Sequence, residues 1–386
     1  MTVSYWQDKS PEHVIECDVC VVGAGIIGLY VARLMSGQGR RTVVLEGRHV
    51  AAGASGRNAG MVLTGAAHHY HEAIGMYGRE LALELWNLSL HNREIVKGLS
   101  GEFGTPYDPC GSLLLALDDT EAEDLERTAD AMLDDGITVK FTHKDPTGRG
   151  FAAAILQPGD AGIHPVRFAE ALAANCGAEV WEQSEVFGWE ALPDGRVEIR
   201  SRRATVRCEM MALCTNAYAP LMHPYFEGKV MPTRGQAFVT EPIGHQVLAQ
   251  LCYADYGYEY FRQLWDGRFF LGGWRHHFRD MEVGYEDRTT EQVQGGLRGF
   301  LERYFPDVMG ARITHSWSGT MGFSVDAIPL AGSLPGEPNV FFAVGFTGHG
   351  LGFGLATAER LAARMLFGQE LGFLDARRLK EKSEQS

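Results

Sequence analysis

The apolar positions at the start of the chain change from the period of a strand to that of a helix and back. Residues 14–22 form a short, valine-rich apolar run, which is typical of a parallel strand buried on both faces. Apolar residues then recur at helical spacing over 27–34, and the glycines at 37 and 39 end this helix. Residues 42–45 are apolar again. The pattern predicts a strand, a helix and a second strand.

Further along, the same periodicities predict three more helices. An amphipathic helix is expected over 80–97, and an acidic start and a closing glycine mark another over 119–134. Pro165 begins a third, which runs to Ala174. After it, residues 180–186 and 197–213 are expected to form strands.

Residues 230–275 have a different sequence pattern from the residues before them, one typical of antiparallel strands. Tyr256, Tyr258, Tyr260 and Arg262 alternate with other residues, which places them on one face of a predicted strand. Asp266-Gly267 is a turn signal, and the apolar run after it predicts the second strand of an antiparallel hairpin. The hairpin indicates a sheet separate from the first.

The end of the chain repeats the order of its beginning. Residues 339–344 predict a buried strand, which leads into GFTGHGLGFG (345–354) and then a helix to about Phe367. We therefore expect an α/β (α+β) protein with a Rossmann-like domain assembled from both termini and an inserted domain with a mainly antiparallel sheet. The expected boundaries are 1–88, 151–222 and 318–386 for the first domain, and 89–150 and 223–317 for the second.

Composition narrows the class of partner. A net charge of −14 over 386 residues argues against nucleic acid or an anionic membrane surface as the main partner, and a small molecule is the expected one. The early acids Asp8, Glu12 and Glu16 interrupt any secretory signal, and no apolar run reaches membrane-spanning length. The seven cysteines are scattered, so the cytoplasm is the expected compartment. The oligomeric state stays open.

The turn after the first strand carries the clearest chemical signal. Gly23, Gly25 and Gly28 form G-x-G-x-x-G, and Glu46 closes the second strand. In this pattern the glycines allow a tight turn, a close approach of the backbone to a pyrophosphate and close packing of the helix on the sheet. The acid accepts ribose hydroxyls and would repel a 2′-phosphate. The pattern predicts a site for FAD or NAD rather than NADP.

Two other patterns invite a metal or redox interpretation. Cys17 and Cys20 spell C-x-x-C, but they lie inside a predicted strand, so we expect buried core cysteines. The histidines 68, 69 and 71, and again 276 and 277, lack acidic or cysteine partners at ligand spacing. We therefore expect no metal site.

With these motifs in place, the chain resembles the D-amino-acid-oxidase-like superfamily of FAD enzymes over nearly its whole length. The likeness is greatest to the branch with gamma-glutamylputrescine oxidase, sarcosine oxidase and glycine oxidase. The segments that carry it, besides the first glycine motif, are GASGRNAG (53–60), GIHPVRFAEAL (162–172), LCTNAY (213–218), MPTRGQAFVTEP (231–242), WSGTMGFSVDAIPLAG (317–332) and GFTGHG (345–350).

The resemblance implies FAD as the cofactor and assigns residues to it. The implied cofactor-binding residues are Gly23, Gly25, Ile26, Ile27, Gly28, Glu46, Gly47, Arg48, Ser55, Gly56, Arg57, Asn58, Ala59, Gly60, Met61, Val186, Thr215, Asn216, Gly345, Thr347, Gly348, His349, Gly350 and Leu351. The helix that begins near Gly350 would direct its positive dipole end at the flavin.

Departures from the relatives' patterns refine this picture. The cysteine and the histidine that attach FAD covalently in some relatives are replaced here, near Gly319 and within 55–58, which predicts non-covalent FAD. The arginine that clamps a substrate carboxylate is replaced by Thr320-Met321-Gly322; Arg262 and Arg234 are possible substitutes, or else surface or domain-interface charges. The strand 268–277 has no lysine of the kind that helps oxygen react in sarcosine oxidases.

The expected activity is oxidation of the C–N bond of a primary or secondary amine to an imine by hydride transfer to flavin N5, with oxygen or another acceptor restoring the flavin. His349 is a candidate catalytic residue, with hydrogen bonding to nearby backbone as its alternative role. The expected partner is thus a small-molecule amine or amino acid. The candidate substrate-binding residues are Met61, Tyr258, Tyr260, Trp274, Trp317 and Met321, although aromatic residues on a sheet more often belong to a core.

Three alternatives stay open at this level. The first is an amino-acid oxidase or dehydrogenase for glycine, D-amino acids or sarcosine, with another arginine holding the carboxylate. The second is a non-catalytic, FAD-bearing subunit of a larger complex. The third, an NAD-dependent dehydrogenase, leaves the segments 53–60 and 345–350 without a role.

Overall fold

The computed structural model describes residues 13–379, and these divide into two compact units. The first unit comprises the chain up to Gly56, Val166–Pro232 and the chain from Met321 on. The second comprises Arg57–Pro165 and Thr233–Thr320. The expected domain boundaries differ from these bounds chiefly at 57–88 and 151–165, which belong to the second unit because Met61–Val62 and Ala161–Ile163 pair there as strands.

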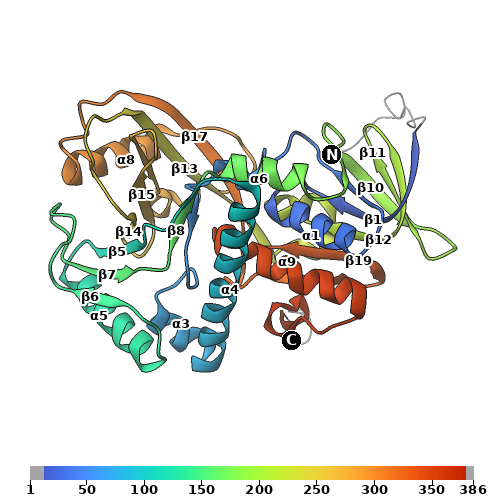
Figure 1. Cartoon of the computed structure of the whole chain (residues 1–386), viewed down its shortest axis with the longest axis horizontal. Coiled ribbons are helices and arrows are strands. Elements are labelled where there is room, and N and C mark those ends of the chain that lie inside the picture. Colours follow the sequence, from blue (N-terminus) through green and yellow to red (C-terminus); the bar gives the residue numbers. More distant parts are fainter. Residues whose placement is uncertain (1–12, 380–386) are drawn as a thin grey trace. The chain divides into compact units, whose positions relative to one another are not determined.

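The first unit is built on an eight-stranded sheet (Figure 1). The path β10-β11-β12-β1-β2-β9 is extended by β19, which pairs in parallel with β12, and by β18 beside β19. The strands are β1 (Val14–Val22), β2 (Thr42–Leu45), β9 (Glu179–Trp181), β10 (Val186–Ala191), β11 (Val197–Ser201), β12 (Thr205–Leu213), β18 (Leu330–Leu334) and β19 (Glu337–Val344). Four pairings in this sheet are parallel: β1 with β2, β1 with β12, β2 with β9, and β12 with β19. They confirm the expected α/β class.

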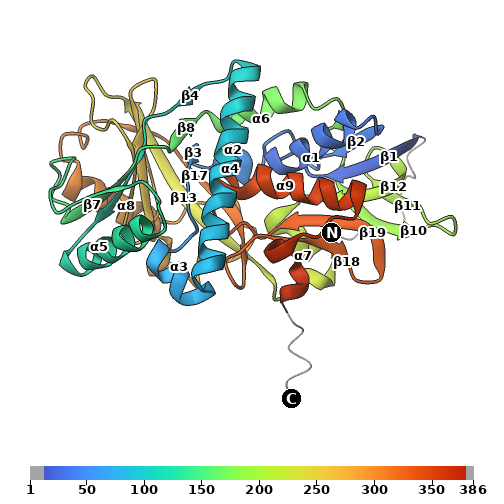
Figure 2. The same cartoon turned by 60° about the horizontal axis from the view of Figure 1, so that its bottom comes forward.

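Two long helices, α1 (Ile26–Gly37) and α9 (Gly350–Phe367), lie side by side against this sheet (Figure 2). They are close because Gly354 has no side chain: a Cβ there would lie 2.8 Å from Cγ1 of Ile27. The Tyr30 hydroxyl also donates to Glu359 Oε1 across the pair, at 2.9 Å. The shorter helices of this unit are α2 (Ala54–Arg57), α6 (Pro165–Ala174) and α7 (Ala219–Met222).

The second unit holds another eight-stranded sheet, ordered β17-β13-β16-β15-β14-β5-β7-β6. Its strands are β5 (Ser112–Ala116), β6 (Lys140–Thr142), β7 (Ala153–Gln157), β13 (Val230–Pro242), β14 (Leu251–Ala254), β15 (Glu259–Gln263), β16 (Arg268–Gly272) and β17 (Ile313–Ser324). The parallel pair β14–β5 interrupts mainly antiparallel pairing. A small sheet, β3-β8-β4, joins Met61–Val62, Ala161–Ile163 and Tyr107–Asp108.

Helices cover parts of this second sheet. α8 (Glu291–Tyr304) packs leucine and aromatic side chains onto β15 and β16, and α5 (Asp119–Asp134) packs onto β5 and β7. The remaining helices of this unit are α3 (Tyr70–Tyr77) and α4 (Arg79–Phe103). The expected bounds of 119–134 are confirmed, whereas the helix expected over 80–97 extends further at its C-terminal end, to the left-handed Gly104.

Two strand predictions were wrong in their extent. Residues 180–186 do not form one strand, because β9 ends at Trp181 and Gln183 adopts φ +56° before β10 begins. Residues 197–213 form two strands, because a turn separates β11 from β12. In this turn the Ser201 N–H and hydroxyl donate to the Ala204 carbonyl oxygen, and Ser201 Oγ accepts from the Ala204 N–H. Residues 50–75 contain α2, β3 (Met61–Val62) and the start of α3.

The cysteines behave as the sequence predicts. Cys17 and Cys20 are buried in the core of the first unit, and all seven cysteines have free thiols. Within residues 13–379, no helix has both the length and the apolar character needed to cross a bilayer.

Candidate functional site

The glycine turn between β1 and α1 leaves no room for side chains. A Cβ on Gly28 would lie 2.0 Å from the carbonyl oxygen of Gly23, and one on Gly25 would lie 2.8 Å from the Ser55 hydroxyl. Gly23 itself adopts φ +108° and donates its N–H to Leu45 O at 2.8 Å. The glycines are therefore required by the fold of the turn, and their lack of side chains is what close approach of a pyrophosphate would need.

The carboxylate of Glu46 lies beside this turn. Its Oε2 accepts from the Ala24 N–H at 2.9 Å, and its Oε1 accepts from the Arg48 N–H at 2.8 Å. Each carboxylate oxygen can accept a further hydrogen bond, so the side chain suits a pair of ribose hydroxyls. It is half-buried at the end of β2 and close to the turn, as the sequence motif predicts.

The short helix α2 supports the turn from its other side. Ser55 Oγ accepts from the Ile26 N–H at 3.1 Å, which ties α2 to the start of α1. Gly56 must be glycine here, because a Cβ would lie 2.3 Å from the Ala51 carbonyl oxygen. This part of GASGRNAG therefore lies against the first glycine motif, although about thirty residues separate them in sequence.

The end of β12 supplies two polar side chains next to the turn. The Thr215 hydroxyl is buried and has no hydrogen-bond partner among the described residues. Asn216 adopts φ +44°, and its Oδ1 accepts from the Gly345 N–H at 3.0 Å. Asn216 thus connects β12 with the C-terminal glycine loop, while an orphaned buried hydroxyl at Thr215 is what a polar ligand at this edge would satisfy.

The C-terminal glycine loop is held by hydrogen bonds of its own. The Thr347 N–H donates to Gly322 O at 2.8 Å, and the Thr347 hydroxyl lies 3.2 Å from the Ser324 nitrogen. His349 is the N-cap residue of α9, and its Nδ1 lies 3.0 Å from Thr347 O. Because a carbonyl can only accept, this contact places the proton of the neutral ring on Nδ1 and makes Nε2 the acceptor nitrogen.

These parts of the first unit fit a dinucleotide that ends in a flavin. Two glycine segments, near residue 25 and near residue 350, lead into the adjacent helices α1 and α9, and Asn216 and Ser55 fix the loops around them. Val186 is buried at the start of β10, and Arg48 lies over the Tyr218 ring at 5.6 Å. The contacts of these residues with FAD stay predictions.

The predicted cofactor residues 57–61 belong to the second unit, and side chains there hold their backbone. Arg57 donates to Asp287 Oδ1 at 2.6 Å and to Ser318 O at 2.8 Å, and the Trp317 indole donates to Arg57 O at 3.0 Å. Asn58 Oδ1 accepts from the Gly60 N–H at 2.8 Å. The segment 57–60 is therefore held in one conformation by its neighbours in this unit.

The two arginines considered as carboxylate clamps are both buried, which corrects their interpretation as surface charges. Arg234 Nε pairs with Glu282 Oε2 at 2.7 Å, and both side chains are 1% exposed. Arg262 donates through Nη1 to Gly60 O at 3.0 Å, and a Cβ on Gly162 would lie 2.4 Å from its Nη2. The positive charge of Arg234 is thus balanced by the carboxylate of Glu282, and Arg262 holds the backbone of the 57–60 segment.

Of the predicted substrate residues, two share a face of the second sheet. Tyr260 on β15 and Trp317 on β17 lie on either side of Phe270 on β16, with ring centroids 6.1 Å and 5.6 Å from that of Phe270. Burial raises the pKa of Tyr260 to about 12, so its hydroxyl stays protonated. We call Tyr260, Phe270 and Trp317 the aromatic row.

Tyr258 and Trp274 lie away from the aromatic row in the second unit, which corrects the predicted place of Tyr258 on the strand face of Tyr260. Asp255 and Tyr256 adopt φ +51° and +53°, so a tight turn precedes β15 and Tyr258 is not on the strand face. The Tyr258 ring lies 4.3 Å from that of His276. The Trp274 indole packs on α8, where a Cβ on Gly296 would lie 1.9 Å from its Nε1.

Met61 and Met321 are not brought together within one unit. Met61 is 6% exposed in the second unit, where it pairs with Gly162, and Met321 is half-buried in the first, 3.5 Å from the position of a Cβ on Gly348. Their predicted contact with substrate stays a prediction.

Several carboxyl groups that are buried in the second unit were not predicted from the sequence. Asp160 accepts from the Thr64 N–H at 2.9 Å and from the Ser112 hydroxyl at 2.6 Å, and burial raises its pKa to about 6. Glu259 is fully buried, and burial together with the charge of Asp255 raises its pKa to about 9. Acids that precede or begin strands gave no local sequence signal, because their partners come from distant segments.

The comparisons with known proteins agree with this geometry. The sequence matches the DAO family, described as FAD dependent oxidoreductase, over residues 18–364. It is 26% identical to gamma-glutamylputrescine oxidoreductase of Escherichia coli (91% of this chain, 83% of that protein) and 28% identical to glycine oxidase of Pseudomonas aeruginosa (91% and 95%). The fold is similar to the crystal structure of glycine oxidase from Geobacillus kaustophilus, with a TM-score of 0.79, 21% identity and coverage of 94% and 98%. The chain therefore belongs to the DAO family of FAD-dependent oxidoreductases.

Proposed function

We propose that this protein oxidises the C–N bond of a primary or secondary amine to an imine, with non-covalent FAD as the acceptor. FAD dependence is a property of the family, and the similarity to gamma-glutamylputrescine oxidoreductase favours an amine among the family's substrates. The substrate class and the C–N chemistry are the proposed parts.

We assign FAD to the glycine turn of the first unit. The backbone around Gly25 would hold the pyrophosphate, Glu46 the ribose, and Thr215 would gain a partner for its buried hydroxyl. The loop that ends at His349 would lie at the flavin, where the start of α9 stabilises negative charge. When bound, FAD supplies an acceptor for the hydride that leaves the carbon next to nitrogen.

The chain's own residues have two tasks in this proposal. The aromatic row would bind the substrate, since aromatic faces accommodate both apolar chains and ammonium groups. His349 would accept a proton at Nε2, because its Nδ1–H donates to Thr347 O. An amine must lose its proton before the nitrogen lone pair can assist departure of the hydride.

The observation that carries the choice of an amine concerns the arginines. An amino-acid substrate needs a cation for its carboxylate, yet Thr320 stands where relatives place an arginine. Arg234 is paired with Glu282, and Arg262 donates to the backbone of residue 60. Arg234 is therefore already paired with a carboxylate, whereas Arg262 donates only to backbone, and its buried Nε has no hydrogen-bond partner among the described residues.

The test is anaerobic reduction of the purified protein by a panel of compounds. Putrescine, γ-glutamylputrescine, sarcosine, glycine and D-alanine are each added, and the loss of oxidised flavin absorbance is followed. We expect bleaching by amines without a carboxylate next to the reacting nitrogen. Bleaching by glycine or D-alanine alone would establish the amino-acid oxidase that the similarity to glycine oxidase favours. No bleaching by any compound would contradict the proposal and favour a non-catalytic subunit. The rate of recolouring in air then reports whether oxygen is the acceptor.

A substitution at Thr320 sharpens the result. Thr320→Arg supplies the missing cation, so its reactivity with sarcosine and glycine should increase relative to wild type. Thr320→Gln is the matched control, because it adds length without charge. Flavin content is measured for both variants, since Thr320 is 8% exposed and must accommodate a larger side chain. Acid precipitation of the wild type should release the flavin into solution, as a non-covalent cofactor requires.

A further inference from the structure

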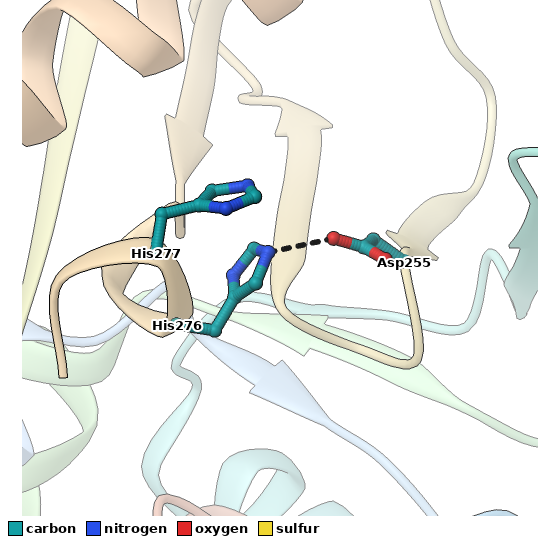
Figure 3. Close-up of side chains that lie close together, drawn as sticks. All are labelled: Asp255, His276 and His277. Carbon is teal, nitrogen blue, oxygen red and sulfur yellow. Dashed lines mark ion pairs between the residues drawn. The ribbon is translucent and has the colours of Figure 1, made fainter.

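Two histidines and an aspartate meet at one end of the β15–β16 hairpin in the second unit. Asp255 follows β14, and His276 and His277 lie in the short 3₁₀ helix η3 (Arg275–Phe278) that follows β16. Both imidazoles project from η3 on the side that faces Asp255 (Figure 3). One ligand atom from each of the three residues lies within 4.8 Å of the others. We call these residues the Asp255 cluster.

The distances in the cluster suit a shared cation. His276 Nε2 lies 2.9 Å from Asp255 Oδ2, and a ligand atom of His277 lies within 4.8 Å of one from each of the other two residues. Ligand atoms around a tetrahedral zinc ion, each at about 2.0–2.1 Å from the metal, are roughly 3.3 Å from one another. The His276–Asp255 pair would therefore need to open by only a few tenths of an ångström to admit a cation at this spacing.

A second observation comes from the buried side of His276. Glu259 is 0% exposed, and its Oε2 has no hydrogen-bond partner among the described residues. Its Oε1 lies 3.8 Å from His276 Nδ1, which is also buried and without a hydrogen-bond partner. A histidine that binds metal through Nε2 carries its proton on Nδ1 and usually donates it to a carboxylate. A cation at Nε2 would place the proton of the ring on Nδ1, and this buried nitrogen would gain Glu259 Oε1 as its acceptor.

We propose that Asp255, His276 and His277 form a binding site for a single divalent cation of the zinc class, with Glu259 as the hydrogen-bond partner that orients His276. Imidazole nitrogens and one carboxylate are the ligands that such cations select, and three protein ligands leave a position for water. The carboxylate of Asp255 offsets the positive charge of Arg275 and Arg279, which lie over the neighbouring Tyr258 ring at 5.1 Å and 5.5 Å.

The experiment is a calorimetric titration of the chelator-treated, untagged flavoprotein with Zn²⁺. We expect one strong site per chain in the wild type. His276→Ala and His277→Ala should each abolish it. His277 is exposed, so its replacement leaves the fold intact even if the His276 variant does not fold. His143→Ala is the matched control, because His143 pairs with Glu126 at 3.5 Å without a second histidine, and this variant should bind as the wild type does.

The role of Glu259 is tested separately. Glu259→Gln should weaken Zn²⁺ binding by about 10–100-fold while its stoichiometry is kept, which is the effect expected of a partner that orients a ligand. The absence of a strong site in the wild type, or a site that survives in His277→Ala, would overturn the proposal and leave Asp255–His276 as a simple ion pair. Because the readout is metal binding, the outcome is independent of the substrate assigned above.

Discussion

The glycine turn of the first unit and the Asp255 cluster of the second are assembled in opposite ways. The turn is made of backbone, and its residues lie within one short segment, where side chains would collide. The cluster is made of side chains from two loops some twenty residues apart, brought together by a hairpin. A site that depends on the absence of side chains can be recognised from the spacing of glycines. A site formed by side chains from distant segments depends on how the strands pair.

The largest effect is expected where an atom is added to the turn. Gly28→Ala puts a methyl group 2.0 Å from the Gly23 carbonyl oxygen, and neither backbone can move without disturbing β1 or α1. We expect the variant to be purified without flavin, as measured by its visible absorbance. Gly37→Ala in the same helix is the control, since a Cβ there meets nothing within 4 Å. Equal flavin content in the two variants would contradict the importance of the turn.

The second prediction concerns a side-chain assembly, the buried pair of Arg234 and Glu282. Glu282→Leu leaves the guanidinium buried without its carboxylate, which should lower the free energy of unfolding by about 3–5 kcal/mol. Replacing both partners, in Arg234→Met with Glu282→Leu, should recover most of this loss because no charge is left uncompensated. Denaturant unfolding measures both. If the two substitutions instead lowered the free energy of unfolding additively, the two side chains would contribute to stability independently of each other.

The third and smallest effect is the pH dependence set by Asp160. Its pKa of about 6 in the folded protein exceeds the ordinary value of about 3.9, because burial disfavours the charged form. The unfolded chain therefore binds fewer protons than the folded chain between these values, and stability from this group is full below pH ~3.9 and lost as the pH rises through 6.

Asp160→Asn removes this titration and keeps the hydrogen bonds, because an amide can accept from Thr64 and donate to the Ser112 hydroxyl. The stability of the variant relative to wild type should rise by roughly 2 kcal/mol between pH 4 and pH 7, which is most of the equivalent of the change in pKa. Urea unfolding at each pH checks this value. A difference between the two proteins that does not change with pH would place the pKa of Asp160 near its ordinary value.

The sequence determined the elements that local chemistry encodes. The strands 14–22 and 42–45, the helices 119–134 and 350–367, and the position of Glu46 beside the glycine turn follow from periodicity and from glycine spacing, and the structure places them as predicted. The family followed from the order of several motifs. These features are readable because each depends on neighbours within a few residues.

Tertiary structure alone decided which distant residues meet. No local pattern shows that Tyr258 leaves the face of Tyr260, since positive φ at Asp255 and Tyr256 turns the chain just before β15. Nor does any pattern join Glu259 to His276, or remove Arg234 from the candidate clamps by pairing it with Glu282. The physical reason is that burial and ion pairing depend on which strands are adjacent, and that order is set by the packing of the whole sheet.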